Sequence, residues 1–101
     1  QRALALSELA DDYMKAGLLD RAENLYKELL QIRPRNLNAL RRLFDIYSVE
    51  QSWADATQVA ERLQQLKDPD SRLLLAHSLC EQAQQALNQG NTRAAREWLK
   101  Q

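Results

Sequence analysis

The sequence predicts an all-α protein in which helical hairpins stack side by side. Three observations lead to this prediction. The chain of 101 residues contains only two glycines and two prolines, which leaves little material for tight turns or long loops. Apolar residues recur at spacings of three and four, the period of an amphipathic helix. The chain also repeats itself at an offset of 34 residues. Together these predict a solenoid of about three helix pairs.

The first pair of helices is indicated by the residues at its boundaries. Leu6, Ala10 and Tyr13 share one helical face, and Gly17 can end that helix in a left-handed conformation. Asp20 is expected to open a second helix that runs to about residue 33, because Pro34 blocks its continuation.

The remaining helices follow the same logic. Asn36 and Ser52 are suitable caps for a third and a fourth helix. The Asp68-Pro69 pair marks the next start, and the fifth helix is expected to cover about 70–88 and end at Gly90. A sixth helix, capped by Asn91 or Thr92, is expected to be cut short at Gln101, so the chain reads as a piece of a longer protein.

The repetition at 34 residues includes residues that define a repeat unit. A helix–turn–helix of this period resembles the tetratricopeptide repeat. Ala22 and Ala56 are expected where two helices cross closely, because only a small side chain fits there. The predicted units are about 3–34, 37–68 and 70–101. The identical pairs are Ala5/Ala39, Leu6/Leu40, Leu9/Leu43, Asp11/Asp45, Tyr13/Tyr47, Ala22/Ala56, Leu29/Leu63 and Gln31/Gln65.

The third unit departs from this pattern. Five extra residues fall near the start of the fifth helix, and Gln82 and Ala86 stand where a leucine and a tyrosine would be expected. Trp98 and Leu99 would pack on a following repeat, so the cut C-terminal edge is expected to be apolar and to permit self-association.

Composition excludes several classes of function. Fourteen basic residues balance 14 acidic ones, so no net charge attracts nucleic acid or anionic lipid. The arginines at 33, 35, 41 and 42 are therefore interpreted as a solvated or peptide-contacting face. The longest apolar run, LLLA at 73–76, is far below the roughly 20 residues of a membrane span. We expect no direct membrane contact from this segment.

Catalytic and metal chemistry find little support. His77, Cys80, Glu81 and Gln84 share one helical face, but a single histidine and a single cysteine do not complete a tetrahedral zinc site. A Cys–His nucleophile would also need an oxyanion pocket, which a glycine-poor helical protein does not provide. We predict a non-catalytic segment without a cofactor or metal, and an enzyme or metal protein built on His77 and Cys80 stays an alternative.

The predicted fold suggests a binding surface instead. The first helix of each pair lines the concave face of such a solenoid, and polar residues there are expected to be free of structural duty and available to a partner protein. One subgroup of these repeats grips terminal carboxylates with lysine, asparagine and arginine, but Ser7, Asp11 and Glu81 at corresponding places argue against such a clamp. The candidate groove residues are Asp11, Lys15, Asn38, Arg41, Arg42, Asp45, His77, Glu81 and Gln84.

Beyond the generic repeat, the chain resembles the lipopolysaccharide assembly protein B family. The resemblance rests on DYMKAGLLDRAE (12–23), IYSVEQSWADATQVAERL (46–63), AHSLCEQA (76–83) and NTRAAREWLK (91–100). It implies an adaptor at the cytoplasmic face of the bacterial inner membrane. Such an adaptor brings the committed-step deacetylase of lipopolysaccharide synthesis to a membrane-bound ATP-dependent protease.

The same resemblance implies a membrane helix and a C-terminal zinc module, and neither lies in this sequence. The alternative is a generic tetratricopeptide module for another envelope-assembly or secretion partner.

Overall fold

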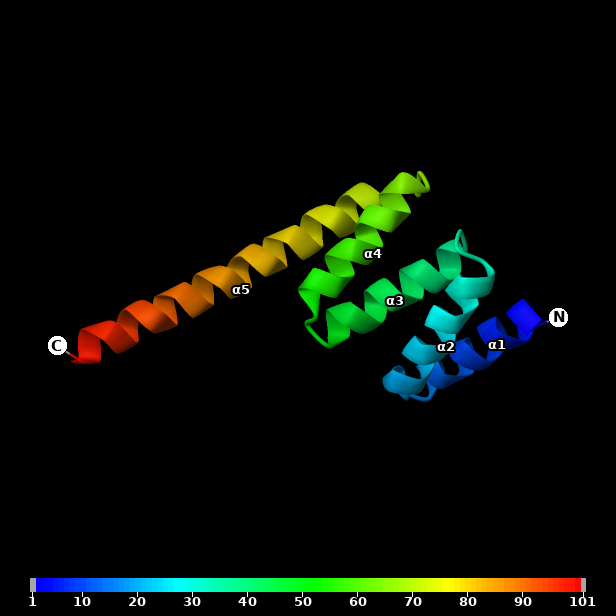
Figure 1. Ribbon diagram of the computed structural model, residues 1–101, viewed down its shortest axis with the longest axis horizontal. Coiled ribbons are helices and arrows are strands. Elements are labelled where there is room, and N and C mark those ends of the chain that lie inside the picture. The colour runs from blue at the N-terminus through cyan, green and yellow to red at the C-terminus, as the bar shows by residue number, and fades with distance from the viewer. Residues whose placement is uncertain (1, 101) are drawn as a thin grey trace.

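The structure, a computed structural model, describes the backbone of residues 2–100 and the side chains of residues 2–90. Five helices follow one another along an elongated body of 64 × 29 × 20 Å, and each packs mainly on its neighbours in sequence (Figure 1). This arrangement confirms the all-α fold of stacked helical hairpins. The helices are α1 (Arg2–Lys15), α2 (Leu19–Ile32), α3 (Leu37–Val49), α4 (Trp53–Gln65) and α5 (Ser71–Lys100).

The turns repeat with the sequence period. After α1, Gly17 adopts a φ of 78°, and the N–H of Leu18 bonds to the carbonyl of Tyr13 at 2.9 Å. Thirty-four residues later Gln51 has a φ of 59°, and the N–H of Ser52 bonds to the carbonyl of Tyr47 at 2.8 Å. Both are the left-handed helix ending in which a residue past the helix reverses the chain. The backbone therefore keeps the period even where glycine is replaced by glutamine.

Helix starts agree with the sequence in part. The Asn36 side chain accepts a hydrogen bond from the N–H of Ala39 at 3.0 Å, as a capping residue should. Ser52 precedes α4 but makes no side-chain capping bond. The helix expected to open at Asp20 begins one residue earlier, and Asp20 lies in its first turn, where a negative charge is favourable.

The core confirms the predicted helix crossings. Ala22 and Ala56 are completely buried, as are Tyr26 and Leu29 beside them. Trp53 at the start of α4 is also buried and packs edge-to-face on His77, with ring centroids 5.2 Å apart. Trp53 therefore packs as a wedge between α4 and α5.

The expected break at Gly90 is wrong. Helix α5 continues through this residue to Lys100, so no sixth helix separates from it. An isolated glycine costs a helix about 1 kcal/mol relative to alanine, and it ends a helix only when it adopts a left-handed conformation, which Gly90 does not. Trp98 and Leu99 lie outside the described side chains, and self-association through them stays a prediction.

Candidate protein-binding groove

Two depressions separate the first helices of successive pairs. One lies between α1 and α3, and the other lies between α3 and the start of α5. Arg42 borders both, so it occupies the place where they meet. The first is lined by Asp11, Met14, Lys15 and Arg42, and the second by Asn38, Arg41, Arg42, Asp45, Asp70, Leu73 and Leu74.

The depressions therefore bring together six of the nine candidate groove residues. Four lining residues were not among the candidates: Met14, Asp70, Leu73 and Leu74. For Asp70, Leu73 and Leu74, the sequence signal was the helix start at Asp68-Pro69. A helix that begins there presents its first turn to α3.

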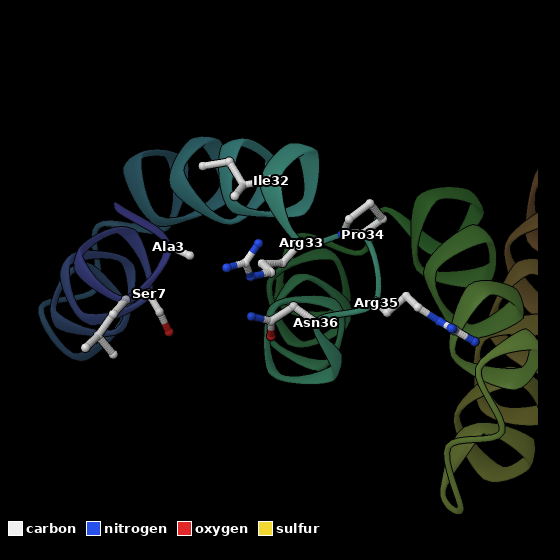
Figure 2. Close-up of a pocket in the computed structure, with 8 residues that line it drawn as sticks. Ala3, Ser7, Ile32, Arg33, Pro34, Arg35 and Asn36 are labelled. Atoms are coloured by element: carbon white, nitrogen blue, oxygen red, sulfur yellow. The ribbon is translucent and has the colours of Figure 1, made fainter. Parts of the chain in front are cut away.

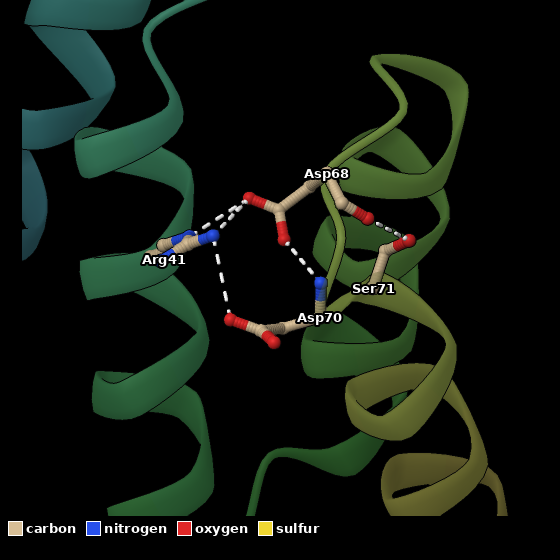
Figure 3. A network of polar contacts seen from close by, with 4 residues as sticks. All are labelled: Arg41, Asp68, Asp70 and Ser71. Carbon is tan, nitrogen blue, oxygen red and sulfur yellow. Dashed lines mark hydrogen bonds and ion pairs between the residues drawn. The ribbon is translucent and has the colours of Figure 1, made fainter.

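Arg41 does not have the free guanidinium that the sequence suggested. It reaches from α3 to the turn before α5, where Nε and Nη2 donate to Asp68 Oδ2 at 2.8 and 2.7 Å (Figure 3). Nη2 also lies 3.5 Å from Asp70 Oδ2. The hydrogen bond and charge of Asp68 raise the pKa of Arg41, so the guanidinium keeps its charge in this contact. The expectation that Arg41 has no structural duty is wrong.

The position of Asp68 explains the structural importance of its contact with Arg41. Its carboxylate is fully buried, and Oδ1 accepts the backbone N–H of Asp70 at 2.9 Å while its carbonyl accepts the Ser71 hydroxyl at 2.7 Å (Figure 3). A buried charge is costly without a partner. Arg41 therefore neutralises the residue that shapes the entry into α5.

Asp11 also carries a structural contact. The hydroxyl of the buried Tyr26 donates a hydrogen bond to its Oδ1. Burial and the neighbouring carboxylate raise the pKa of Tyr26, which keeps the phenol protonated as a donor. This contact ties α2 to α1, so the expectation of a purely partner-binding role is wrong for Asp11 as well.

Arg42 and Asp45 form a looser pair. Arg42 Nη1 lies 3.7 Å from Asp45 Oδ2, and about half of each side chain is exposed. Partial burial raises the pKa of Asp45, and the charge of Arg42 opposes this rise. An exposed pair of this kind contributes little to stability. Arg42 is thus available to a partner where Arg41 is not.

The three candidates on α5 lie apart from the depressions. The His77 ring packs on Trp53, and Gln84 Nε2 donates to Asn88 Oδ1 at 3.1 Å. Glu81 is partly buried and, like the other two, lines neither depression. Cys80 is exposed. In the part of the chain whose side chains are described, one group of three potential metal ligands has its atoms within 4.8 Å of one another, namely Asp20, Glu23 and Glu50.

Sequence comparisons agree with this architecture. The tetratricopeptide repeat family model matches residues 13–80. Lipopolysaccharide assembly protein B of Escherichia coli K12 is 42% identical over 84% of the chain, and the protein of that name from Haemophilus influenzae is 39% identical over 83%. The chain spans 22% and 21% of these relatives. No solved structure gives a significant match.

Within residues 2–100, no helix combines the length and apolar character that crossing a membrane requires. The family match begins near the end of α1, ends within α5 and has the length of two 34-residue periods. It includes the buried Ala22 and Ala56 at the helix crossings. The chain belongs to the tetratricopeptide repeat family and is a homologue of lipopolysaccharide assembly protein B.

Proposed function

We propose that this chain is a non-catalytic protein-binding segment of an adaptor that regulates lipopolysaccharide synthesis. The adaptor presents the committed-step deacetylase to a membrane-bound ATP-dependent protease at the cytoplasmic face of the inner membrane. The membrane anchor and the zinc module belong to other parts of the parent protein. This proposal is supported by homology to proteins named for lipopolysaccharide assembly.

The observation that carries the proposal is the position of Arg42. Its half-exposed guanidinium borders both depressions, so a partner segment that crosses from α1 to α5 must pass it. Among the described side chains, its one ion pair is the loose contact with Asp45. Arg42 can therefore form a charge-assisted hydrogen bond with a partner without giving up a structural contact. Leu73, which is 75% exposed, offers apolar surface at the far side of the second depression.

The test is capture of the deacetylase and the protease by the full-length protein carrying Arg42→Glu. Arg72→Glu is the matched control, because Arg72 is an exposed arginine that lines neither depression. We expect Arg42→Glu to weaken capture of at least one partner and let the deacetylase accumulate, with an unchanged melting temperature. Equal capture by both variants would exclude this groove as the docking surface.

The alternative is a tetratricopeptide module that serves another envelope-assembly or secretion partner. The same capture experiment separates the two, because the alternative predicts that neither the deacetylase nor the protease is retained by the unaltered protein.

A further inference from the structure

A third pocket lies where the first turns of α1 face the connection from α2 to α3. Its apolar lining comes from Ala3, Leu4 and Ile32, and its polar lining comes mainly from Ser7, Arg33 and Asn36. Leu4 is 57% exposed, so the apolar surface is accessible to solvent. Leu4 and Ser7 are also on the α1 face that leads towards Asp11 and the α1–α3 depression.

The polar groups of this pocket are hydrogen-bond donors. Figure 2 shows the Arg33 guanidinium directed into the space between α1 and α3, with the Asn36 and Ser7 side chains pointing towards the same space. Asn36 uses Oδ1 to accept the N–H of Ala39 at 3.0 Å, which leaves its amide N–H groups to donate. The pocket therefore combines a cation and two neutral donors with apolar walls.

The charge of this pocket differs from that of the two depressions. Aspartates contribute to both depressions, whereas no acidic residue lines this pocket in the described part of the chain. Among the described side chains, the Arg33 guanidinium forms no hydrogen bond or ion pair. A planar guanidinium that lacks a carboxylate is suited to bind one from another molecule in a bidentate manner.

We infer that this pocket binds an acidic side chain and the apolar side chain two residues from it in an extended segment of the partner protein, because alternate side chains of an extended segment share one face. The carboxylate takes the hydrogen bonds of Arg33 and Asn36, and the apolar side chain packs on Leu4 and Ile32. This inference rests on the proposed protein-binding function and specifies which side chains of the partner the pocket recognises.

The chain provides a matched control for the test. Arg35 is two residues from Arg33 and borders the same pocket, but its guanidinium points away from it in Figure 2. Arg33→Gln and Arg35→Gln therefore remove the same charge from the same turn, and only the first removes it from the pocket. Both residues are exposed, so neither change should alter the melting temperature.

The probe is a fluorescent, end-capped peptide with a glutamate and a leucine separated by one glycine and flanked by glycine and serine residues. Two companion peptides carry glutamine for the glutamate or serine for the leucine. Fluorescence anisotropy should show that Arg33→Gln lowers the affinity for the glutamate–leucine peptide by about tenfold. This is the change expected when one charge-assisted hydrogen bond is lost. Arg35→Gln should leave that affinity unchanged. Leu4→Ser should lower the affinity for the leucine-containing peptides only.

Several results would overturn the inference. It is wrong if the glutamate–leucine peptide does not bind, or if the two arginine variants weaken it equally, since that would indicate a general charge effect. Tighter binding of an uncapped peptide without glutamate would identify a terminal carboxylate as the ligand instead. Capture assays with the full-length protein keep the two proposals apart. Failure of the unaltered protein to capture a partner contradicts the proposed function, whereas unchanged capture by Arg33→Gln contradicts the pocket alone.

Discussion

Helices α1 to α4 and the long helix α5 differ in how far they bury their apolar side chains. In the first region Tyr26, Leu29 and Leu63 are fully buried between neighbouring helices. On α5, Leu79 and Leu87 remain 49% and 58% exposed, and Figure 1 shows the later part of this helix extending beyond α4. A solenoid helix buries apolar surface only where another helix covers it, so identical residue types make different contributions in the two regions.

The contacts that attach α5 are also more polar. The Thr57 hydroxyl on α4 is buried and has Ser78 Oγ at 3.1 Å and Gln82 Oε1 at 2.5 Å on α5. Ser78 is completely buried. The α1–α2 crossing instead places Ala22 and Tyr26 in the apolar core. Directional hydrogen bonds thus fix the position of α5 where the repeat pattern of large apolar residues is absent.

The largest expected effect contrasts a buried leucine with an exposed one. We expect Leu29→Ala to lower the free energy of unfolding by about 2–5 kcal/mol, because it leaves a cavity in the core. Leu87→Ala should change it by less than about 0.5 kcal/mol. Urea denaturation followed by circular dichroism measures both. Similar losses in the two variants would show that α5 is covered along its length.

A close helix crossing should resist enlargement. Ala56→Leu is expected to lower the free energy of unfolding by about 1–3 kcal/mol, because the added atoms force neighbouring side chains out of their preferred rotamers. Ala54→Leu is the control, since Ala54 lies on the exposed side of the same helix. If both variants melt at the same temperature as the unaltered protein, Ala56 is not at a crossing.

The joint between the two regions can be tested at Arg41. Arg41→Gln should lower the melting temperature, because it leaves the buried Asp68 carboxylate without its cation. Arg42→Gln removes only the 3.7 Å pair with Asp45 and should leave the melting temperature unchanged. Differential scanning calorimetry compares the variants. Equal melting temperatures would mean that Asp68 does not depend on Arg41.

The smallest expected effect is a stabilisation. Gln51→Gly should raise the free energy of unfolding by about 0.5 kcal/mol, because relief of the left-handed conformation outweighs the greater chain entropy of glycine. Gln58→Gly, on the exposed face within α4, should lower it by about 1 kcal/mol. A decrease in both variants would show that the turn after α3 does not favour glycine.

The sequence predicted the parts of the fold that depend on local requirements. Ala22 and Ala56 were recognised because a close crossing demands a small side chain at a fixed place in the repeat. Gly90 was misread because glycine occurs both inside helices and at their ends, and the backbone conformation that separates these cases is not visible in the residue type. The residue type of Gln51 does not indicate its left-handed conformation. Its offset of 34 residues from Gly17 was the available signal.

The candidate groove was predicted as a set of helix faces but not in its details. Arg41 and Asp68 are 27 residues apart, and Asp68 was explained fully by its place before Pro69, so nothing in the pattern joined the two. The contact from Tyr26 to Asp11 was missed for a similar reason, since the two residues are 15 positions apart and no feature of the repeat links them. The Arg33 pocket was missed because a connection between helices was treated as a boundary.

The Arg41–Asp68 contact also helps to set the direction of α5. This helix contains 30 residues and is therefore about 45 Å long. Arg41 holds the turn before its first residue, and Thr57 holds Ser78 and Gln82 further along. Two points of attachment along one helix axis define its orientation, so the loss of the Arg41 contact is expected to loosen the direction in which the C-terminal end of α5 points.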